Sequence, residues 1–433
     1  MFLGACEGSR SQVAFSHASD TDSVSWLIVV SADGGGWIIL ALLGKPLLML
    51  LSMLTVGLPI ATYLLWSRLP ARRIIRLGSR VLLIVSCQLA AVMLVAAAMN
   101  DYGYFYTSWS DLIVSTVGTP VAPVPQALSV SGGIGQKGTN VRSDRTAVHL
   151  MADPGWFTRA QWTTSGRIVE VRIEGARSAL SGTAAVWLPP QYFLPAYAHR
   201  QFPAVEVLTG YPGSETGLIS GMKYPQYLLG EITAHRAAPM VLVMMRSAVA
   251  FPRDTECTDV PAGPEALTYF SQDVPAAISN AFRVRATGWG AMGDSTGGYC
   301  AVKIAMMHSD VIPAAVAMSG YFHTLRDQTT GDLWGGSAEL RKLNDLEWRL
   351  MHLPAPPASL FLAISRTESG PNGYRDTKRF LSQVHSPLQV QTMLLPSGGH
   401  NFTSWSQEMG PGLDWLSARL AAAGTPRAPN NFG

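Results

Sequence analysis

Residues 288–307 read GWGAMGDSTGGYCAVKIAMM. The apolar run before Gly293 is typical of a buried strand, and the residues after Gly298 are typical of a helix. A serine between two such elements lies on a sharp turn that exposes its hydroxyl, and glycines two residues to either side, Gly293 and Gly297, keep side chains from colliding there. The pattern predicts that Ser295 is a nucleophile. A glycine-rich turn with an inert serine is the alternative.

Around this segment, short runs rich in apolar and β-branched residues alternate with longer stretches that can form helices. The later runs are almost continuously apolar, as strands covered on both faces are, and the first two follow each other closely, as in an antiparallel hairpin at a sheet edge. This rhythm predicts an α/β fold with a mostly parallel sheet flanked by helices. The expected strands are IVEVRI (168–173), AAVWLP (184–189), AVEVL (204–208), MVLVMM (240–245), GWGAMG (288–293), AAVAMS (314–319), SLFLAI (359–364) and VQTMLL (390–395).

Two later segments can complete a serine site. In a strand–turn–helix site of this kind, the acid and then the histidine follow the serine, so His400, in LLPSGGHNFTSW just beyond the last expected strand, is the predicted base. Three other histidines follow the serine, but none lies just beyond the last expected strand. They are His308, His323 and His385. Glu368 is the first carboxylate after SLFLAIS and is predicted to orient the imidazole. Asp376 is the alternative, although it is better suited to open a helix.

A tetrahedral oxyanion needs two backbone N–H donors. One is predicted at Thr296, directly after the serine. The other is predicted at Tyr211, in the Thr-Gly-Tyr-Pro turn after AVEVL, where Gly210 lets the backbone approach closely. An ordinary Gly-Pro turn is the alternative for this second position.

The composition narrows the function classes. The 433 residues are 48% hydrophobic and 14% charged, and a formal net charge of +3 without a basic run interleaved with aromatics argues against a nucleic-acid partner. The four cysteines, Cys6, Cys87, Cys257 and Cys300, form no pair or Cys/His cluster at metal-ligand spacing, so no metal and no cofactor are expected. Cys257 and Cys300 lie in the same expected domain, where they can form a disulfide outside the cell or remain two buried thiols.

Two uncharged stretches are long enough to cross a bilayer. Residues 46–66 and 81–100 hold PLLMLLSMLTVGLPIATYLLW and VLLIVSCQLAAVMLVAAAMN, each about 30 Å long as a helix. The loop 67–80 carries five arginines and no acid, so it is expected in the cytoplasm and the C-terminal part outside it. Buried helices of a soluble core are the alternative. The apolar patch at 26–43, broken by Asp33 and glycines, is interpreted as interfacial, with a third span left open.

These features divide the chain into five parts: an N-terminal segment outside the cytoplasm, a transmembrane hairpin, a linker rich in Val, Pro, Gly and Ser, one folded domain, and a disordered tail. The expected boundaries are 1–45, 46–100, 101–164, 165–424 and 425–433. Aromatic residues at the start of the linker suit a membrane–water boundary. They are Tyr102, Tyr104, Tyr106 and Trp109.

The globular part resembles the esterase-D-like family of α/β-hydrolases, which includes the secreted mycolyltransferases of actinobacteria. The resemblance covers about residues 165 to 422 and rests on the Gly-Asp-Ser-Thr-Gly-Gly turn, a cysteine-bearing loop before LTYFSQDVPAAI, Ser-Arg-Thr-Glu, and His-Asn-Phe-Thr-Ser-Trp. It implies the α/β-hydrolase fold and favours Glu368 over Asp376, because the family uses Glu as its acid. Thr209 stands where the mycolyltransferases carry an aspartate that helps grip a sugar. The resemblance therefore does not extend to trehalose, and water or another alcohol can be the acceptor.

The favoured hypothesis is a serine ester hydrolase or acyltransferase of the cell envelope, which acts on an acyl-ester or lipid substrate through an acyl-enzyme on Ser295. It is expected in the cytoplasmic membrane as a multi-pass protein, held in the bilayer by both helices, with its catalytic domain on the extracytoplasmic side. The fused hairpin is similar to membrane-tethered esterase-like proteins of actinobacteria. The rival hypothesis is a non-catalytic membrane-anchored scaffold, against which the presence of Ser, Glu and His argues. A peptidase on the same fold has no positive support.

Overall fold

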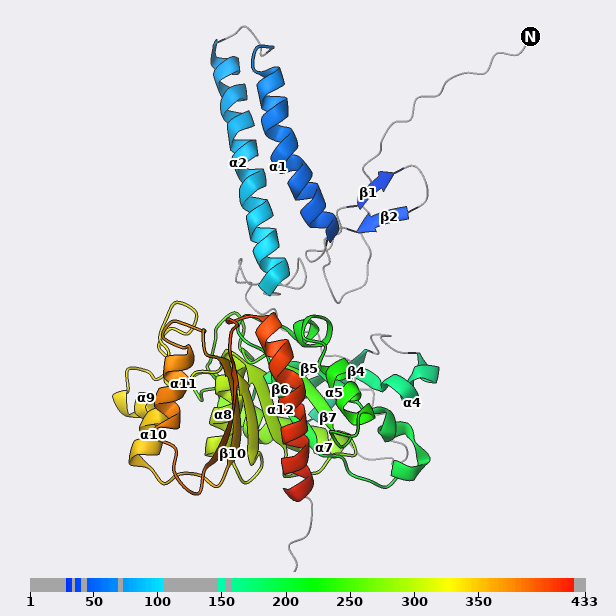
Figure 1. Cartoon of the computed structure of the whole chain (residues 1–433), viewed down its shortest axis with the longest axis vertical. Helices are drawn as coiled ribbons and strands as arrows, with labels where there is room; N and C mark the ends of the chain where they lie inside the picture. Colours follow the sequence, from blue (N-terminus) through cyan, green and yellow to red (C-terminus); the bar gives the residue numbers. More distant parts are fainter. Residues whose placement is uncertain are drawn as a thin grey trace, which may run out of the picture. The chain divides into compact units, whose positions relative to one another are not determined.

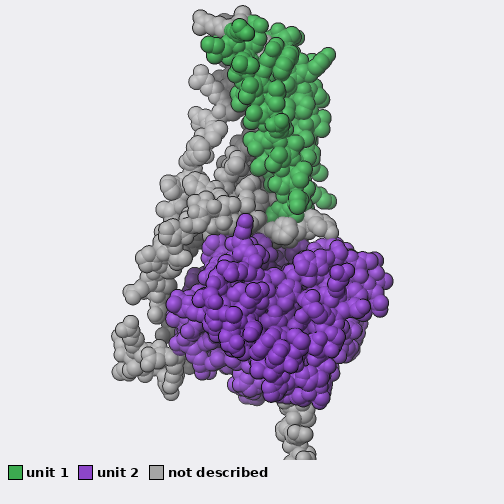
Figure 2. Space-filling model, turned by 90° about the vertical axis from the view of Figure 1, so that its left-hand side faces the viewer, with its two compact units in different colours: residues 1–119 green, residues 120–433 purple. Residues whose placement is uncertain are grey.

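The computed structural model describes residues 29–32, 36–39, 45–68, 73–103, 147–152 and 158–423. It divides into two compact units, residues 1–119 and 120–433, which Figure 2 colours separately. The predicted tail, most of the predicted linker, its four aromatic side chains and most of the N-terminal segment lie outside the described residues.

Two long apolar helices make up most of the described part of the first unit. They are α1 (Lys45–Leu65) and α2 (Arg73–Gly103). Each is long and apolar enough to cross a membrane by length and composition, and few of their apolar side chains are buried. They pack on each other through Leu47, Leu51 and Ala97. The pair fits a membrane anchor and a helical hairpin.

The structure shortens the expected basic loop, because α2 begins at Arg73 rather than near residue 81. Arginine is a good helix former with a long apolar stem, so a helix can extend through such a segment.

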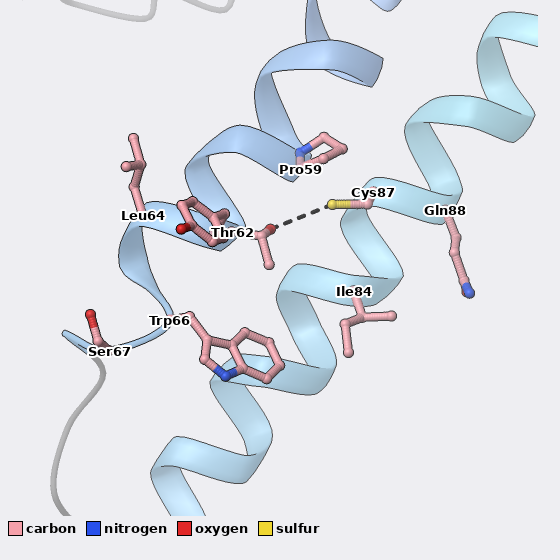
Figure 3. A pocket seen from close by; sticks show the side chains of 9 residues that line it. Pro59, Thr62, Leu64, Trp66, Ser67, Ile84, Cys87 and Gln88 are labelled. Carbon is pink, nitrogen blue, oxygen red and sulfur yellow. Dashed lines mark hydrogen bonds between the residues drawn. The ribbon is translucent and has the colours of Figure 1, made fainter.

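The guanidinium of Arg80 lies 4.4 Å from the ring centre of Trp66. Nearby, Thr62 and Cys87 point toward one another across a groove between the two helices (Figure 3), with Oγ1 and Sγ 3.5 Å apart.

The apolar patch ahead of α1 forms strands in its described residues. Strands β1 (Val29–Ala32) and β2 (Gly36–Ile39) pair antiparallel, with Val29 opposite Ile39. The described part of this patch is therefore a two-stranded ribbon and not a third spanning helix.

The second unit is built on a nine-stranded sheet in the order β11-β10-β9-β8-β6-β7-β5-β4-β3 (Figure 1). The strands β6 to β11 pair in parallel with one another, and the pairs β3–β4, β4–β5 and β5–β7 are antiparallel. The predicted α/β-hydrolase class and the mostly parallel sheet are confirmed. The strands are β3 (Ala147–Ala152), β4 (Arg167–Glu174), β5 (Ser181–Leu188), β6 (Ala204–Leu208), β7 (Val241–Met245), β8 (Gly290–Asp294), β9 (Ala314–Met318), β10 (Ser359–Ser365) and β11 (Gln389–Leu395).

The sheet begins earlier than the expected domain boundary near residue 165. Strand β3 lies inside the predicted linker and pairs antiparallel with β4, with Val148 opposite Ile173 and a register shift after Leu150. The sequence AVHLMA is short and follows a Gly- and Pro-rich stretch, which is why it carried no clear strand signal. The predicted hairpin of β4 and β5 is present, but β3 and not β4 is the edge of the sheet.

The two faces of the sheet carry separate hydrophobic cores. One face has Ile304 and Phe380 in its core and is covered by α7 (Val274–Ala281), α8 (Thr296–Met307), α10 (Leu346–His352) and α11 (Tyr374–Leu381). The other has Leu413 in its core and is covered by α5 (Tyr224–Thr233) and α12 (Phe402–Ala423). Neighbouring strand residues alternate between them, since Leu208 belongs to the first core and Val207 to the second.

The helical segments of this unit are η1 (Arg159–Gln161), α4 (Trp162–Ser165), η2 (Pro190–Phe193), η3 (Pro195–Tyr197), η4 (Gly217–Gly221), α5 (Tyr224–Thr233), α6 (Ala266–Thr268), η5 (Tyr269–Asp273), α7 (Val274–Ala281), α8 (Thr296–Met307), α9 (Ala338–Asn344), α10 (Leu346–His352), α11 (Tyr374–Leu381) and α12 (Phe402–Ala423). Strand β6 has β7 on one side and β8 on the other. The loops leaving β6 and β8 therefore turn to opposite faces, and the crevice between them, at the carboxyl ends of the strands, is where ligands bind in open α/β sheets.

Candidate active site

A tight turn joins β8 to α8 at Ser295. The residue has φ +52°, a left-handed conformation that few side chains adopt. A Cβ on Gly293 would lie 2.4 Å from the carbonyl carbon of Gly297, and a Cβ on Gly297 would lie 2.1 Å from the carbonyl oxygen of Leu208. Only glycines fit at these two positions, so the local sequence and the strained turn that presents Ser295 depend on each other.

Three side chains from separate loops meet at this turn in one line of hydrogen bonds. The Nε2 atom of His400 lies 2.8 Å from Oγ of Ser295, and its Nδ1 atom lies 2.8 Å from Oε1 of Glu368. The other carboxylate oxygen, Oε2, accepts a hydrogen bond from Oγ of Ser319 at 2.7 Å. The arrangement can remove a proton from the serine hydroxyl and hold the charge that appears on the imidazole.

The histidine lies in the loop between β11 and α12, which is fixed from both sides. The amide of Gly399 donates to Oγ of Ser404 at 3.0 Å, and the amide of Ser404 donates to Oδ1 of Asn401 at 3.1 Å. The ring of Trp405 packs edge-on against His400, with 5.1 Å between ring centres. These contacts hold an imidazole whose side chain is 44% exposed, so it is accessible from solvent without being loose.

Glu368 lies just after β10, and its carboxylate is buried. Its side chain is 4% exposed, against 44% for His400. The hydroxyl of Thr367 donates to the carbonyl of Gly398 at 2.8 Å, which ties the loop of the acid to the loop of the histidine. The acid and the base are therefore positioned together.

Asp376, the alternative acid, is engaged elsewhere. Its carboxylate lies 2.8 Å from Nδ1 of His323, accepts from the amide of Phe322 at 3.0 Å, and pairs with Arg379. Among the described residues, Asp376 makes no hydrogen bond or ion pair with His400. The structure therefore places Glu368, and not Asp376, against the histidine that contacts the serine.

Thr296 directly follows Ser295, and Tyr211 directly follows Gly210, which lies against the turn. Thr296 is the first residue of α8, where a helix leaves its amides without partners inside the helix. Gly210 approaches so closely that a Cβ there would lie 3.2 Å from Cβ of Ser295. Its amide donates to Oδ2 of Asp294 at 3.0 Å, and burial raises the pKa of that carboxyl to about 6. Tyr211 follows directly, with its hydroxyl donating to the carbonyl of Pro252 at 2.7 Å.

Cys257 and Cys300 are joined by a disulfide, with their Cα atoms 5.5 Å apart. The bond ties the loop around residue 257 to α8, one turn after Ser295.

Lys303, on the same helix, has a fully buried ammonium. It donates to the carbonyl of Glu256 at 3.0 Å and to Oγ1 of Thr258 at 2.8 Å. Burial lowers the pKa of Lys303 to about 7.

Sequence reasoning missed several groups near the site. A lysine inside the apolar helix sequence YCAVKIAMM was a visible signal for Lys303, because a buried charge needs partners. Glu408 of α12 is also fully buried, and burial, with the nearby charge of Glu368, raises its pKa to about 8. It therefore keeps its proton at neutral pH. Ser319, which follows β9, gave no sequence signal.

Metal ligation has no support in the described part of the chain, where no group of three or more His, Cys, Asp or Glu side chains could hold an ion.

Several solved structures are similar to this chain at low sequence identity. A ferulic acid esterase is 16% identical, with a TM-score of 0.50, over 60% of this chain and 99% of that one. An S-formylglutathione hydrolase from Agrobacterium tumefaciens is also 16% identical, with a TM-score of 0.49, over 59% of this chain and 96% of that one. Mycobacterium tuberculosis MPT51 is 15% identical, with a TM-score of 0.41, over 55% of this chain and 94% of that one. No curated protein matches the sequence.

A family model described as "Putative esterase" matches residues 181–416, from the start of β5 to the middle of α12. The match takes in Ser295, Glu368 and His400 as well as the loop after β6. Since it spans more than half of the chain, this protein belongs to the esterase family of α/β-hydrolases.

Proposed function

We propose that the protein is a serine ester hydrolase or acyltransferase that works through an acyl-enzyme on Ser295. The observation that carries the proposal is the line from Oγ of Ser295 through the ring of His400 to Glu368, with 2.8 Å at each link. Membership of the esterase family supports hydrolase chemistry at this site.

In the first step, Oγ of Ser295 attacks the carbonyl carbon of an ester while Nε2 of His400 takes the hydroxyl proton. The carbonyl oxygen becomes an oxyanion, which the amides of Thr296 and Tyr211 stabilise. The tetrahedral intermediate then collapses: the bond from carbon to the leaving oxygen breaks, and His400 returns the proton to the leaving alcohol. The acyl group stays on Ser295.

In the second step, water or an alcohol attacks the acyl carbon and gives its proton to His400. Collapse of the new intermediate releases the acid or the new ester and restores the serine hydroxyl. Throughout, Glu368 accepts a hydrogen bond from the Nδ1–H group of His400, which fixes the tautomer and stabilises the imidazolium. Ser319 holds the second carboxylate oxygen of Glu368 in place.

The contacts of Thr209 favour water or an alcohol other than trehalose as acceptor. This side chain is 4% exposed, and its hydroxyl accepts a hydrogen bond from the amide of Ser247 at 3.3 Å. A group that braces two loops in this way does not offer the carboxylate with which the similar mycolyltransferases help grip a sugar.

The proposed location is the cytoplasmic membrane, with α1 and α2 as spans and the second unit outside. The arginines between the helices and at the start of α2 favour the cytoplasm. A disulfide between Cys257 and Cys300 persists in an oxidising compartment, which supports an extracytoplasmic position for the second unit. Treatment of intact cells with a protease that does not cross the membrane tests this. Cleavage of the second unit in intact cells is expected, and cleavage only after lysis would place the unit inside.

The test of the chemistry is mass spectrometry of the full chain after incubation with a fluorophosphonate, alongside Ser295→Ala. A single adduct on Ser295, absent from the variant and from denatured protein, is the expected result. A folded protein without an adduct would instead favour the non-catalytic scaffold. Adding glycerol or a sugar to an ester assay then separates the two activities: diversion of the acyl group to the added alcohol identifies a transferase, and release of free acid alone identifies a hydrolase.

A further inference from the structure

A buried polar network lies behind the serine turn, away from His400. Glu256 is 3% exposed, Lys303 is fully buried and Tyr321 is 2% exposed. The tyrosine hydroxyl donates to Oε1 of Glu256, and Lys303 donates to the backbone carbonyl of the same residue. Buried charged and polar groups cost free energy unless they are paired, so this network is a demanding arrangement for the fold to maintain.

The network reaches the residue next to the serine. The hydroxyl of Tyr321 lies 3.3 Å from Oγ1 of Thr296, which in turn donates to Oδ2 of Asp254 at 3.4 Å. Thr296 is thus held through its side chain, while its backbone amide is the proposed oxyanion donor. A displacement of the side chain would rotate that amide.

The loop that supplies Asp254 and Glu256 is itself tightly constrained. Glu256 and Cys257 have φ values of +50° and +44°, which are costly for residues other than glycine. The disulfide from Cys257 to Cys300 ties this loop to the helix that Thr296 begins. Loop and helix therefore form one piece on which the position of Thr296 depends.

We propose that Tyr321 and Glu256 are positioning residues for the oxyanion site: they hold Thr296 so that its N–H points at the developing negative charge. The inference rests on the proposed acyl-transfer function and adds residues that touch neither substrate nor His400. It assigns a catalytic consequence to a tyrosine hydroxyl that contacts Glu256 and the side chain of Thr296.

The chain offers a matched control. Tyr299 is also buried and stacks on Tyr321, with ring centres 4.9 Å apart and planes at 12°. Its hydroxyl donates to the carbonyl of Asn344 at 2.7 Å, away from Thr296. Tyr299→Phe and Tyr321→Phe therefore remove the same group from the same stack, but only the second change breaks a contact with the network.

The experiment measures hydrolysis of p-nitrophenyl butyrate by the full chain in detergent, together with inhibition by a simple alkylboronic acid, which forms a tetrahedral adduct on an active serine. Tyr321→Phe should lower kcat roughly tenfold with KM within about twofold, and weaken boronate inhibition by a similar factor. Tyr299→Phe should leave both quantities within about twofold. Equal effects of the two variants, or no effect of Tyr321→Phe, would overturn the inference.

A second variant keeps the test decisive if Tyr321→Phe does not fold. Thr296→Val removes the hydroxyl that contacts both Tyr321 and Asp254 with almost no change of shape, and it should lower kcat by a similar factor. In the double variant the losses should not multiply, because both changes break one pathway. Multiplying losses would show that Tyr321 acts elsewhere.

Failure of this inference can be told from failure of the proposed function. If Ser295→Ala leaves the ester hydrolysis of the full chain unchanged, the acyl-enzyme on Ser295 is wrong and the positioning role falls with it. If Ser295→Ala abolishes hydrolysis while Tyr321→Phe matches the wild-type kcat, the acyl-enzyme stands and only the positioning role is wrong.

Discussion

Two histidine–carboxylate pairs in the second unit have nearly the same geometry and different surroundings. His400 lies 2.8 Å from Glu368 through Nδ1, and His323 lies 2.8 Å from Asp376 through Nδ1. His400 has the Ser295 hydroxyl on its other ring nitrogen, whereas among the described residues no hydroxyl bonds to Nε2 of His323. A histidine–carboxylate pair alone therefore does not define an active site. The group that contacts Nε2, the second ring nitrogen, makes the difference.

The two carboxylates also differ in what balances their charge. Asp376 accepts from Arg379 and from the amide of Phe322, so its charge is compensated and it ties the chain after β9 to α11. Within the described part of the chain, the carboxylate of Glu368 receives only the neutral hydroxyl of Ser319 besides the imidazole. A positive charge that forms on His400 during a reaction is therefore the best partner available to Glu368, whereas Asp376 already has one in Arg379.

The sharpest test of this comparison is the loss of each ring. His400→Ala should lower kcat for a simple ester by about 10⁶-fold, because the serine loses its base. His323→Ala should leave kcat within about threefold. Steady-state kinetics on the full chain measures both, and a comparable loss in the two variants would show that the pairs are not distinct in function.

The acids should differ nearly as much. Glu368→Gln keeps the shape but should lower kcat about 10⁴-fold, since the imidazole loses the partner that fixes its tautomer and its charge. A pre-steady-state burst assay should show slower acylation with similar substrate binding. Retention of wild-type acylation in Glu368→Gln would remove the acid from the proposed site.

The opposite pattern is expected for Asp376→Asn. Its carboxylate is fully buried and pairs with Arg379, so the change should lower the free energy of unfolding by about 2–3 kcal/mol and leave kcat within about threefold. Urea unfolding followed by tryptophan fluorescence measures the first quantity. Glu339→Gln on exposed α9 is the control and should change the free energy by less than about 0.5 kcal/mol. A stability equal to the wild type would contradict a structural role for the pair.

The smallest effect concerns pH. The hydrogen bond that His323 donates to Asp376 raises the pKa of the ring above its usual 6.5, although burial and Arg379 oppose the shift. A raised pKa in the folded protein means that the charged ring stabilises the fold fully below the unfolded pKa, and that this stabilisation is lost as pH rises through the folded pKa. The difference in unfolding free energy between wild type and His323→Gln should therefore shrink as the pH rises above about 6.5, the usual pKa of the ring. A difference that grows with pH would contradict the assignment.

Much of the fold could be predicted because most of its strands are short, almost continuously apolar runs, separated by stretches that can form helices. All eight expected runs coincide with strands of the sheet, from β4 to β11. Strand β3 could not be predicted, because AVHLMA depends for its conformation on pairing with β4 and has little apolar pattern of its own. Helix α2 begins at Arg73, ahead of the predicted span 81–100. The arginines of residues 67–80 indicate a loop, although arginine is also a good helix former.

For the site, chain order was informative because the carboxyl ends of parallel strands meet at one edge. That rule led to Ser295, Glu368 and His400, which the structure brings together. The same rule does not predict the partners of Asp376. It also does not predict the contact between Tyr321 and Glu256, two residues that lie 65 positions apart in the sequence. Such contacts depend on which loops cross, and a single sequence contains no local sign of that.

Strand β3 has a practical meaning for anyone who shortens this chain. The family match begins at β5, so a fragment cut there would lose β3 and β4 together, and a cut at Gly166 would leave β4 as a bare edge. Unpaired strand edges recruit other strands and lead to aggregation. A fragment that starts ahead of Ala147 keeps β4 paired with β3, as in the full chain, and is the version to express.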